Sequence, residues 1–273
     1  MRELTFAAPD GVRLAAADWG GSGRDVLLLH GGGGNLAGWI ELVELLRDDF
    51  RLAAFDHRAH GASEVGPPPY AYDDVRYDTD AAIRALGLEE PLLVGHSLGA
   101  ALALRHAAEH GGVAGVVALD GPAAWRPGET RAKPVYTEEE LRERGFGWSG
   151  TDDKLEARLA VVDGRAEQAE VRRAHRRGPD GLLHGRPTIE FLIAPAPSGT
   201  YPYTTALYKR IACPVLLLNA AAGLYVDKRA LLEEVEREHP HVTVEWLECD
   251  HGMHFTAPIA VASRIRAFAG ELG

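Results

Sequence analysis

Six short runs of consecutive apolar residues recur along the chain, and each has the length of a β-strand. Their valine and leucine residues are continuous rather than alternating, which is typical of strands buried on both faces, as in a parallel sheet. The six runs are DVLLLH, RLAAFD, PLLVG, VAGVVALD, PVLLLN and VTVEWL, at residues 25–30, 51–56, 91–95, 113–120, 214–219 and 242–247. The pattern predicts a mostly parallel sheet at the centre of the fold.

Helical spacing characterises the segments between these runs. The expected helices cover residues 36–48, 75–87, 98–111, 228–239 and 259–270. Strands that alternate with helices predict βαβ crossovers, and hence an α/β fold whose central sheet is flanked by helices. Near the start, residues 4–6 and 12–19 flank the turn sequence Pro9-Asp10-Gly11, which predicts an antiparallel hairpin leading into the sheet.

One long interval, residues 121–211, breaks the alternation. About ninety residues between two strands are too many for an ordinary connection. The interval contains three Glu-rich or Arg-rich stretches with a helical pattern, so we expect a helical cap over the carboxyl edge of the sheet, inserted after the sixth strand. Residues 1–120 and 212–273 would form the core. Charge runs at 138–144 and 172–177 are expected to be solvated helix faces.

Composition limits the partners of the chain. Its 273 residues carry a formal net charge of −11 and are 46% hydrophobic, which argues against disorder. Nucleic acids and anionic membranes bind clustered Lys and Arg, so we expect neither as a partner. The start of the chain shows no signal-peptide pattern and its two cysteines form no disulfide framework, so we expect a cytoplasmic protein. Nothing in the sequence excludes a homodimer.

The pentapeptide Gly95-His96-Ser97-Leu98-Gly99 follows one apolar run directly and precedes an expected helix. A G-x-S-x-G sequence at a strand-to-helix turn is typical of a nucleophile elbow, in which the glycines relieve crowding and the serine hydroxyl is exposed. The adjoining helix N-terminus favours negative charge. We expect Ser97 to be a nucleophile; the alternative is a glycine-bracketed turn whose serine has no chemical role.

A glycine-rich loop, His30-Gly31-Gly32-Gly33-Gly34-Asn35, follows the first of the six runs. Backbone N–H groups on such a loop can bind an oxyanion without obstruction by side chains. We expect the amides of Gly32 and Leu98 to be the donors. A phosphate-binding loop is the alternative, but the Lys-Ser/Thr pair of a P-loop is missing.

A serine nucleophile needs a base, and His251 lies just after the last expected strand, where the loop returns to the sheet edge that carries Ser97. His254 is its rival. The pairs His57/His60 and His251/His254 have metal-ligand spacing, but neither has a third ligand nearby in the sequence. We therefore expect no metal and no cofactor.

With the octapeptide Asp56-His57-Arg58-Ala59-His60-Gly61-Ala62-Ser63, these motifs resemble the α/β-hydrolase fold family with a helical cap, over essentially the whole chain. The family's D-x-R-G-H-G-x-S has glycine where Ala59 stands. The resemblance also implies His251 as the catalytic histidine, because the family's histidine precedes an Ala-Pro pair by this interval. We expect a charge-assisted hydrogen bond between Asp56 and Arg58 to organise their loop. The motifs are specific for the fold and weak for the substrate.

The catalytic acid departs from the family pattern. The resemblance implies an Asp soon after the run at 214–219, but the first carboxylate there, Asp227, stands about four residues late. A minority of the family places the acid one strand earlier, where this chain has Asp120, and the order Ser97, Asp120, His251 is then the family's. We favour Asp120; Asp227 and the absence of an acid stay open.

These features predict a serine hydrolase that cleaves an ester, thioester or lactone of a small-to-mid-sized hydrophobic molecule. Ser97 argues against relatives that use Asp as the nucleophile. The alternatives are a C–C bond hydrolase, a lyase, or a binding protein that has lost turnover. Residues expected to line the substrate pocket are His30, His96, Trp125, Trp148 and Phe191, with further apolar surface from Phe146, Leu192, Ile193, Tyr201 and Tyr203.

Overall fold

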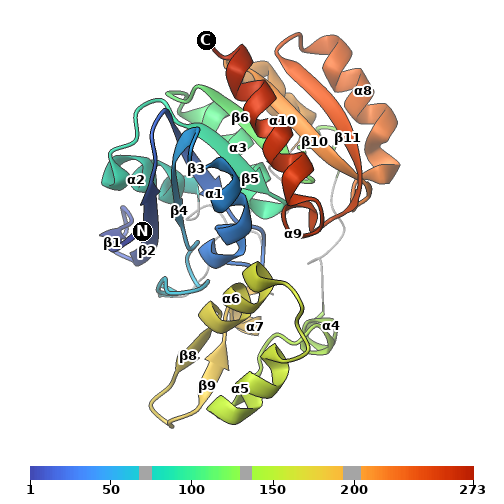
Figure 1. The fold of residues 1–273 in the computed structure, drawn as a ribbon. Helices are drawn as coiled ribbons and strands as arrows, with labels where there is room; N and C mark the ends of the chain where they lie inside the picture. Colours follow the sequence, from blue (N-terminus) through green and yellow to red (C-terminus); the bar gives the residue numbers. More distant parts are fainter. Residues whose placement is uncertain (68–75, 130–136, 193–203) are drawn as a thin grey trace.

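The computed structural model describes residues 1–67, 76–129, 137–192 and 204–273. Its main feature is an eight-stranded sheet with the order β1-β2-β4-β3-β5-β6-β10-β11 (Figure 1). The strands are β1 (Arg2–Ala7), β2 (Arg13–Gly20), β3 (Arg24–Leu29), β4 (Phe50–Phe55), β5 (Leu92–His96), β6 (Gly115–Leu119), β10 (Val215–Ala222) and β11 (Val242–Asp250). Only the pairs β1–β2 and β2–β4 of this sheet are antiparallel. The predicted mostly parallel sheet and the N-terminal hairpin are confirmed.

Helices cover both faces of the sheet, as predicted. One face carries η1 (Leu36–Trp39), α1 (Ile40–Leu46), α9 (Met253–Thr256) and α10 (Pro258–Glu271). The other carries α2 (Arg76–Leu86), α3 (Leu98–Glu109), η3 (Thr205–Arg210) and α8 (Arg229–Glu238), which begins after η4 (Val226–Lys228). The expected helix at 36–48 opens as a 3₁₀ turn and ends at Leu46, and its start is capped by the Asn35 side chain, which accepts from the Ala37 amide.

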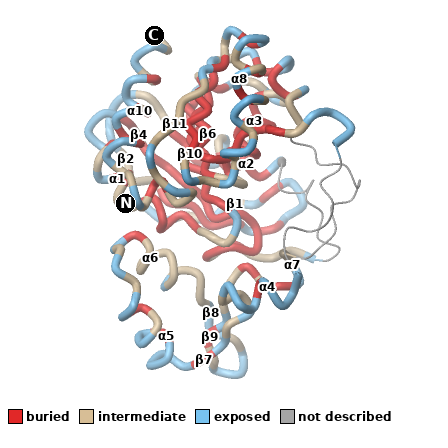
Figure 2. Tube along the Cα trace, turned by 90° about the vertical axis from the view of Figure 1, so that its right-hand side faces the viewer, coloured by how far each residue is buried: buried red, intermediate tan, exposed pale blue. Residues whose placement is uncertain are grey.

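In the eight-stranded sheet, the strands from β2 to β11 each contribute to two hydrophobic cores, whereas β1 contributes to one. In β3, Leu27 and Leu29 pack toward α3, whereas Val26 and Leu28 pack toward α1 and α10. Successive side chains of a strand point to opposite faces, so a strand covered on both sides has no polar position. Figure 2 shows the buried trace concentrated in these strands. This explains why the apolar runs are continuous in the sequence.

The elements from α4 to α7, which lie between β6 and β10 and are here called the inserted segment, form a separate group (Figure 1). They are α4 (Glu138–Glu143), β7 (Ser149–Gly150), α5 (Asp152–Leu159), α6 (Arg165–Arg173), β8 (His175–Arg177), β9 (Leu183–Gly185) and α7 (Ile189–Leu192). β7, β9 and β8 form a three-stranded antiparallel sheet. The segment expected to be a helical cap therefore contains a small sheet as well as helices.

The Arg-rich run at 172–177 shows why. Helix α6 ends at Arg173, and residues 175–177 pair with β9 instead of continuing the helix. The turn sequence Gly178-Pro179-Asp180-Gly181, with Gly181 at φ 78°, reverses the chain between the two strands. The inserted segment has a small core of its own, in which Leu155, Leu159 and Leu183 pack with Trp148 and Val171.

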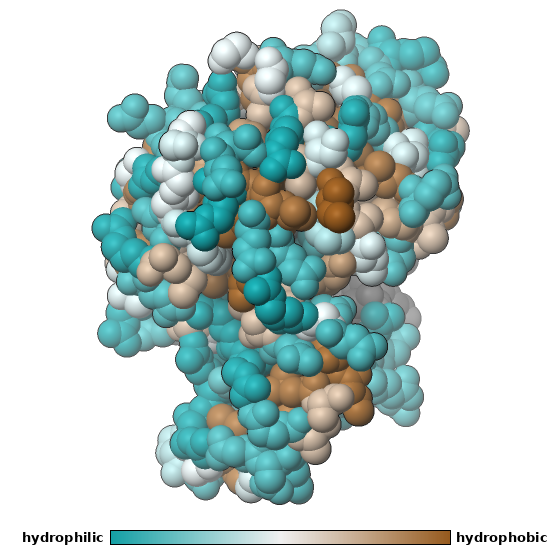
Figure 3. Space-filling view, in the orientation of Figure 1, coloured by the Kyte–Doolittle hydropathy of each residue, from teal (hydrophilic) through white to brown (hydrophobic). Residues whose placement is uncertain are grey.

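The face seen in Figure 1 is mostly hydrophilic, with small apolar areas on the sheet domain and on the inserted segment (Figure 3). Within the ranges that the structure describes, no helix is both long and apolar enough to cross a bilayer.

Candidate active site

Ser97 lies at the tight turn between β5 and α3 and is partly exposed. Its backbone has φ 50° and ψ −111°, a conformation that non-glycine residues rarely adopt and that often marks functional sites. The flanking glycines make the turn possible: a Cβ atom would lie 2.3 Å from Gly99 O if placed on Gly95, and 2.0 Å from Leu29 O if placed on Gly99. Since Ser97 immediately precedes α3, its side chain is next to the positive end of the helix.

Asp120 and His251, which are 131 residues apart in the sequence, meet at the carboxyl edge of the sheet. His251 Nδ1 lies 2.6 Å from Asp120 Oδ2. The Asp120 side chain is fully buried, whereas that of His251 is 31% exposed. Asp120 also accepts from the backbone amides of Ala220 and Leu224, both at 3.1 Å. Three donors therefore converge on one buried carboxylate.

Asp227, the alternative acid, lies on η4 with its side chain 67% exposed, and its Oδ2 is 3.6 Å from Lys228 Nζ. The residue that makes room for Asp120 is Gly223, where a Cβ would lie 2.4 Å from Asp120 Oδ2. The A-A-A-G sequence that replaces the expected acid therefore accommodates a carboxylate from the neighbouring strand.

The His251 ring packs on that of His96 with centroids 4.6 Å apart, and His96 in turn packs on His254 at 4.4 Å. His96 Nε2 donates to the carbonyl oxygen of His251 at 2.8 Å, and burial lowers the pKa of His96 to about 4, so that its ring is neutral. His254, the rival base, is buried against the rings of Trp39, His96 and Phe255. Burial holds its pKa well below the usual value. Of the two histidines, His251 is the one beside Asp120.

The glycine loop is fixed by buried histidines. His60 Nε2 accepts from the Gly33 amide at 3.1 Å, and His30 Nε2 accepts from the His57 amide at 2.9 Å. Burial lowers the pKa of His57 to about 3 and that of His60 to about 4, so these rings serve as neutral hydrogen-bonding groups. His30, expected to line the substrate pocket, is almost completely buried and supports the loop.

Two backbone amides near the glycine loop and the Ser97 turn have no hydrogen-bond acceptor among the described residues. Within the described parts of the chain, the N–H groups of Gly32 and Leu98 donate no hydrogen bond. A Cβ on Gly32 would lie 3.9 Å from Leu98 Cδ2, so the two residues are neighbours. Amides without partners on neighbouring residues are one requirement of an oxyanion hole.

Helix α6 of the inserted segment binds directly to this loop. Glu170 Oε1 accepts from the Asn35 amide at 3.1 Å, and the Glu170 carbonyl accepts from Asn35 Nδ2 at 2.8 Å. Burial raises the pKa of Glu170 to about 7. One turn further, Arg173 Nε donates to the fully buried Asp56 at 2.9 Å. Sequence reasoning missed both contacts, and the expectation that 172–177 is a solvated face is wrong for Arg173.

The expected bond between Asp56 and Arg58 is also wrong. Arg58 donates to both carboxylate oxygens of Asp78, at 2.8 and 2.7 Å, and to Asp10 at 2.8 Å. Asp56 instead accepts from the Leu36 and Ala62 amides, besides Arg173. Asp56 and Arg58 therefore point in different directions. Asp56 binds the inserted segment through Arg173, whereas Arg58 binds α2 through Asp78.

The aromatic residues expected around the substrate are spread over several places. Phe191 packs edge-to-face on His60 with ring centroids 6.0 Å apart, and Phe146 lies against Gly33. Trp148 belongs to the core of the inserted segment, and Trp125 packs edge-to-face on Tyr225. Leu192 ends α7 and is partly buried. Ile193, Tyr201 and Tyr203 lie outside the described residues.

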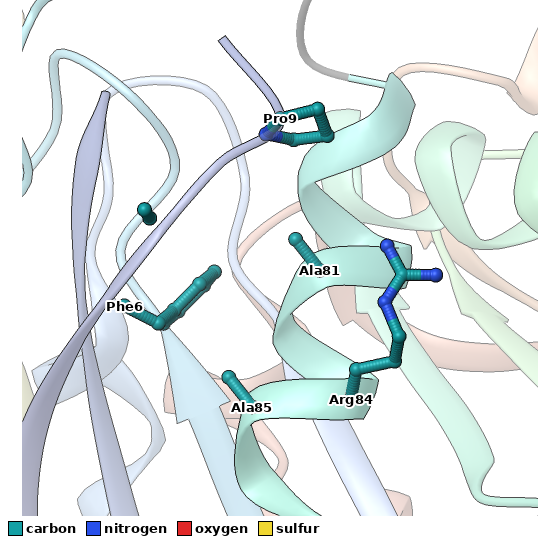
Figure 4. A pocket seen from close by; sticks show the side chains of 6 residues that line it. Phe6, Pro9, Ala81, Arg84 and Ala85 are labelled. Carbon is teal, nitrogen blue, oxygen red and sulfur yellow. The ribbon is translucent and has the colours of Figure 1, made fainter. Parts of the chain in front are cut away.

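A cavity of about 470 Å³ between β1 and α2 contains none of these site residues; its lining is Phe6, Ala7, Pro9, Ala81, Arg84 and Ala85 (Figure 4). Across the residues described, no three His, Cys, Asp or Glu side chains lie together as metal ligands would.

Several known proteins are similar to this chain in sequence, and others are similar to it in fold. The chain is 36% identical over 110 residues to a putative carbamate hydrolase, RutD, of Caulobacter segnis, a match that covers 38% of the chain and 41% of that relative. It is 33% identical over 148 residues to N-formylmaleamate deformylase of Pseudomonas putida, covering 52% of the chain and 54% of the relative. The chain thus spans about half or less of the length of these curated relatives.

A longer match joins the chain to fluoroacetate dehalogenase of a Burkholderia species, at 28% identity over 75% of the chain and 73% of that protein. The crystal structure of E-2-(acetamidomethylene)succinate hydrolase superposes with a TM-score of 0.75 and 25% identity, over 98% of the chain and all of that structure. The sequence profile of the alpha/beta hydrolase family matches residues 26–264, and this chain therefore belongs to the alpha/beta hydrolase family.

Proposed function

We propose that the protein is a serine hydrolase that cleaves an ester, thioester or lactone through Ser97, His251 and Asp120. The observation that carries the proposal is the 2.6 Å hydrogen bond between His251 Nδ1 and the buried Asp120 carboxylate, at the edge of the sheet where Ser97 occupies its strained turn. A carboxylate in this position fixes the tautomer of the imidazole, so that Nε2 carries a lone pair for the serine proton.

The proposed reaction has an acylation and a deacylation stage. His251 Nε2 removes the proton of Ser97 as Oγ attacks the substrate carbonyl, and the oxygen that becomes negative accepts from the Gly32 and Leu98 amides. The imidazolium returns its proton to the leaving alcohol or thiol, and the acyl group remains on Ser97. Water, deprotonated by His251, then hydrolyses the acyl-enzyme and restores the serine.

In this proposal the inserted segment, within residues 121–211, acts as a cap over the site. Its support is the contact of α6 with the glycine loop through Glu170 and Asn35, and the packing of Phe146 and Phe191 near the same loop. Aromatic rings around a reacting centre favour an apolar substrate body. The names of two relatives, a carbamate hydrolase and a deformylase, extend the proposed acyl chemistry to amide-type bonds.

Hydrolysis of p-nitrophenyl acetate, a thioester and a lactone tests the proposal. We expect turnover in the wild type and its loss in Ser97→Ala, while Ser263→Ala, a change of an exposed serine on α10, leaves it intact. Turnover that survives in Ser97→Ala refutes the proposal. Thermal stabilisation by substrate analogues without any product would instead favour a protein that binds ligands and has lost catalysis.

A further inference from the structure

A second, smaller cavity of about 160 Å³ separates the glycine loop from the inserted segment. Gly33 forms part of its wall, and Phe146, whose Cζ would lie 2.7 Å from a Cβ on Gly33, forms another part. Three arginines also line it: Arg144, Arg158 and Arg186. The cavity therefore begins one residue from the Gly32 amide and is rich in guanidinium groups.

Neither Arg158 nor Arg186 forms an ion pair with a described residue. Most arginines of the inserted segment form ion pairs, as Arg172 does with Glu156 and Arg177 with Asp152. Among the described residues, neither Arg158 nor Arg186 has a carboxylate oxygen within 4.0 Å. The chain has a net charge of −11, so two cations at one cavity without an ion-pair partner among the described residues are unusual. Together they would attract an anion into the cavity.

Of the two arginines, Arg186 is held in place by a hydrogen bond to the core. Its Nη1 donates to the Ser63 carbonyl at 2.8 Å, which ties β9 and its loop to the core. Burial and the neighbouring Arg176 cation lower the pKa of Arg186, and the Glu64 carboxylate offsets this effect only in part. A bound anion would stabilise the charged form of the Arg186 guanidinium.

Glu170 lines the same cavity without cancelling its positive charge. Its Oε1 accepts from the Asn35 amide rather than from a guanidinium, and burial raises its pKa to about 7. His175 also lines the cavity; its Nδ1 donates to the Val171 carbonyl at 2.6 Å, and burial and the Arg158 cation lower its pKa. A neutral imidazole and a partly ionised carboxyl face two guanidinium groups, so the net charge around the cavity is positive.

We propose that this cavity binds a carboxylate carried by the substrate, so that the enzyme acts on small acyl compounds with a second, anionic end, such as half-esters of dicarboxylic acids. A volume of 160 Å³ holds about five heavy atoms if each takes the ~30 Å³ of a liquid water, which suits a carboxylate and a short stem. The planar guanidinium matches a carboxylate with two parallel hydrogen bonds. The inference rests on the proposed function, because Gly32 and Gly33 connect the expected oxyanion site to the cavity.

Monoethyl succinate and ethyl butyrate differ only by a carboxylate in place of a methyl group, and their hydrolysis provides the test. We expect kcat/KM to be at least tenfold higher for monoethyl succinate. Arg158→Gln and Arg186→Gln should each reduce this ratio severalfold or more. Arg177→Gln, which changes an exposed arginine paired with Asp152, serves as the matched control and should keep the wild-type ratio.

Calorimetric titration with succinate supplies a readout that does not depend on turnover. We expect wild-type protein to bind succinate and Arg158→Gln to bind it at least tenfold more weakly. Equal kcat/KM for the two esters, or a ratio that both arginine variants retain, overturns the carboxylate site, while loss of ethyl butyrate hydrolysis in Ser97→Ala would still support the serine hydrolase. Succinate binding in a protein that hydrolyses neither these esters nor p-nitrophenyl acetate, the thioester or the lactone would support the site and count against the hydrolase.

Discussion

Replacement of Asp120 by asparagine tests the least conventional part of the proposed site. The Asp120 carboxylate receives three donors: His251 Nδ1–H and the amides of Ala220 and Leu224. Asparagine has nearly the same shape but only one acceptor oxygen, and its amide group carries two donors. If the asparagine oxygen keeps the Ala220 amide, which binds Oδ1, the NH₂ group takes the place of Oδ2. There it faces both the Leu224 amide and His251, and it favours the tautomer that places the proton on Nε2. That tautomer cannot accept the proton of Ser97.

The expected loss follows from this change of tautomer. Removal of the orienting carboxylate in a serine triad lowers kcat by about 10³–10⁴, which corresponds to about 4–5.5 kcal/mol on the activation free energy. Folding is affected less: a buried donor without an acceptor costs about 1–3 kcal/mol in the free energy of unfolding. We therefore expect a folded protein with a large catalytic defect, and not a general loss of structure.

Steady-state hydrolysis of p-nitrophenyl acetate, together with urea unfolding monitored by circular dichroism, separates the two effects. Asp227→Asn is the matched control, since it makes the same chemical change at the exposed alternative acid and should leave kcat within about twofold, as a surface substitution usually does. An Asp120→Asn protein with kcat within threefold of the wild type would refute the assignment. So would a large loss in Asp227→Asn alone.

Three further changes have defined outcomes. Between pH 7 and pH 5 the free energy of unfolding should fall by about 2 kcal/mol for each of His57 and His60, because their pKa is near 6.5 in the unfolded chain but about 3 and about 4 in the folded protein. The raised pKa of Glu170 opposes this fall in part. Urea unfolding midpoints that do not change with pH would contradict the prediction. Gly99→Ala should abolish ester hydrolysis and cost about 3 kcal/mol, because its Cβ would lie 2.0 Å from a carbonyl oxygen; an active variant of wild-type stability would show that the elbow can relax. Arg173→Gln should cost about 3 kcal/mol in urea unfolding because it leaves Asp56 buried without a cation, and a loss below 1 kcal/mol would contradict this.

The parts of the site that sequence could predict are those whose cause is local. The elbow around Ser97 needs two glycines at fixed spacing between a strand and a helix, and all of these are contiguous in the chain. Strands buried on both faces can be recognised in the sequence as continuous apolar runs. The carboxyl ends of parallel strands meet at one edge, which is why Asp120 could be named from its position after β6.

The contacts of the inserted segment could not be predicted in this way. The pair Arg173–Asp56 joins residues 117 positions apart, and the charge run that contains Arg173 looks the same whether it faces water or a buried carboxylate. The pair Glu170–Asn35 depends likewise on how α6 docks against the core. Pairwise contacts between separately folded elements leave no periodic signal, so helical spacing alone favoured a solvated helix at 172–177.

Labelling with a fluorophosphonate probe tests the central claim most directly, because such probes react with a serine only when a base has activated it. The modified residue is identified by peptide mass spectrometry in the wild type, in His251→Ala and in His254→Ala, with the folded state of each checked by circular dichroism. The account predicts rapid modification of Ser97 in the wild type and near-complete loss of labelling in His251→Ala. A folded wild-type protein whose Ser97 is not labelled, or is labelled equally fast in His251→Ala, would contradict it.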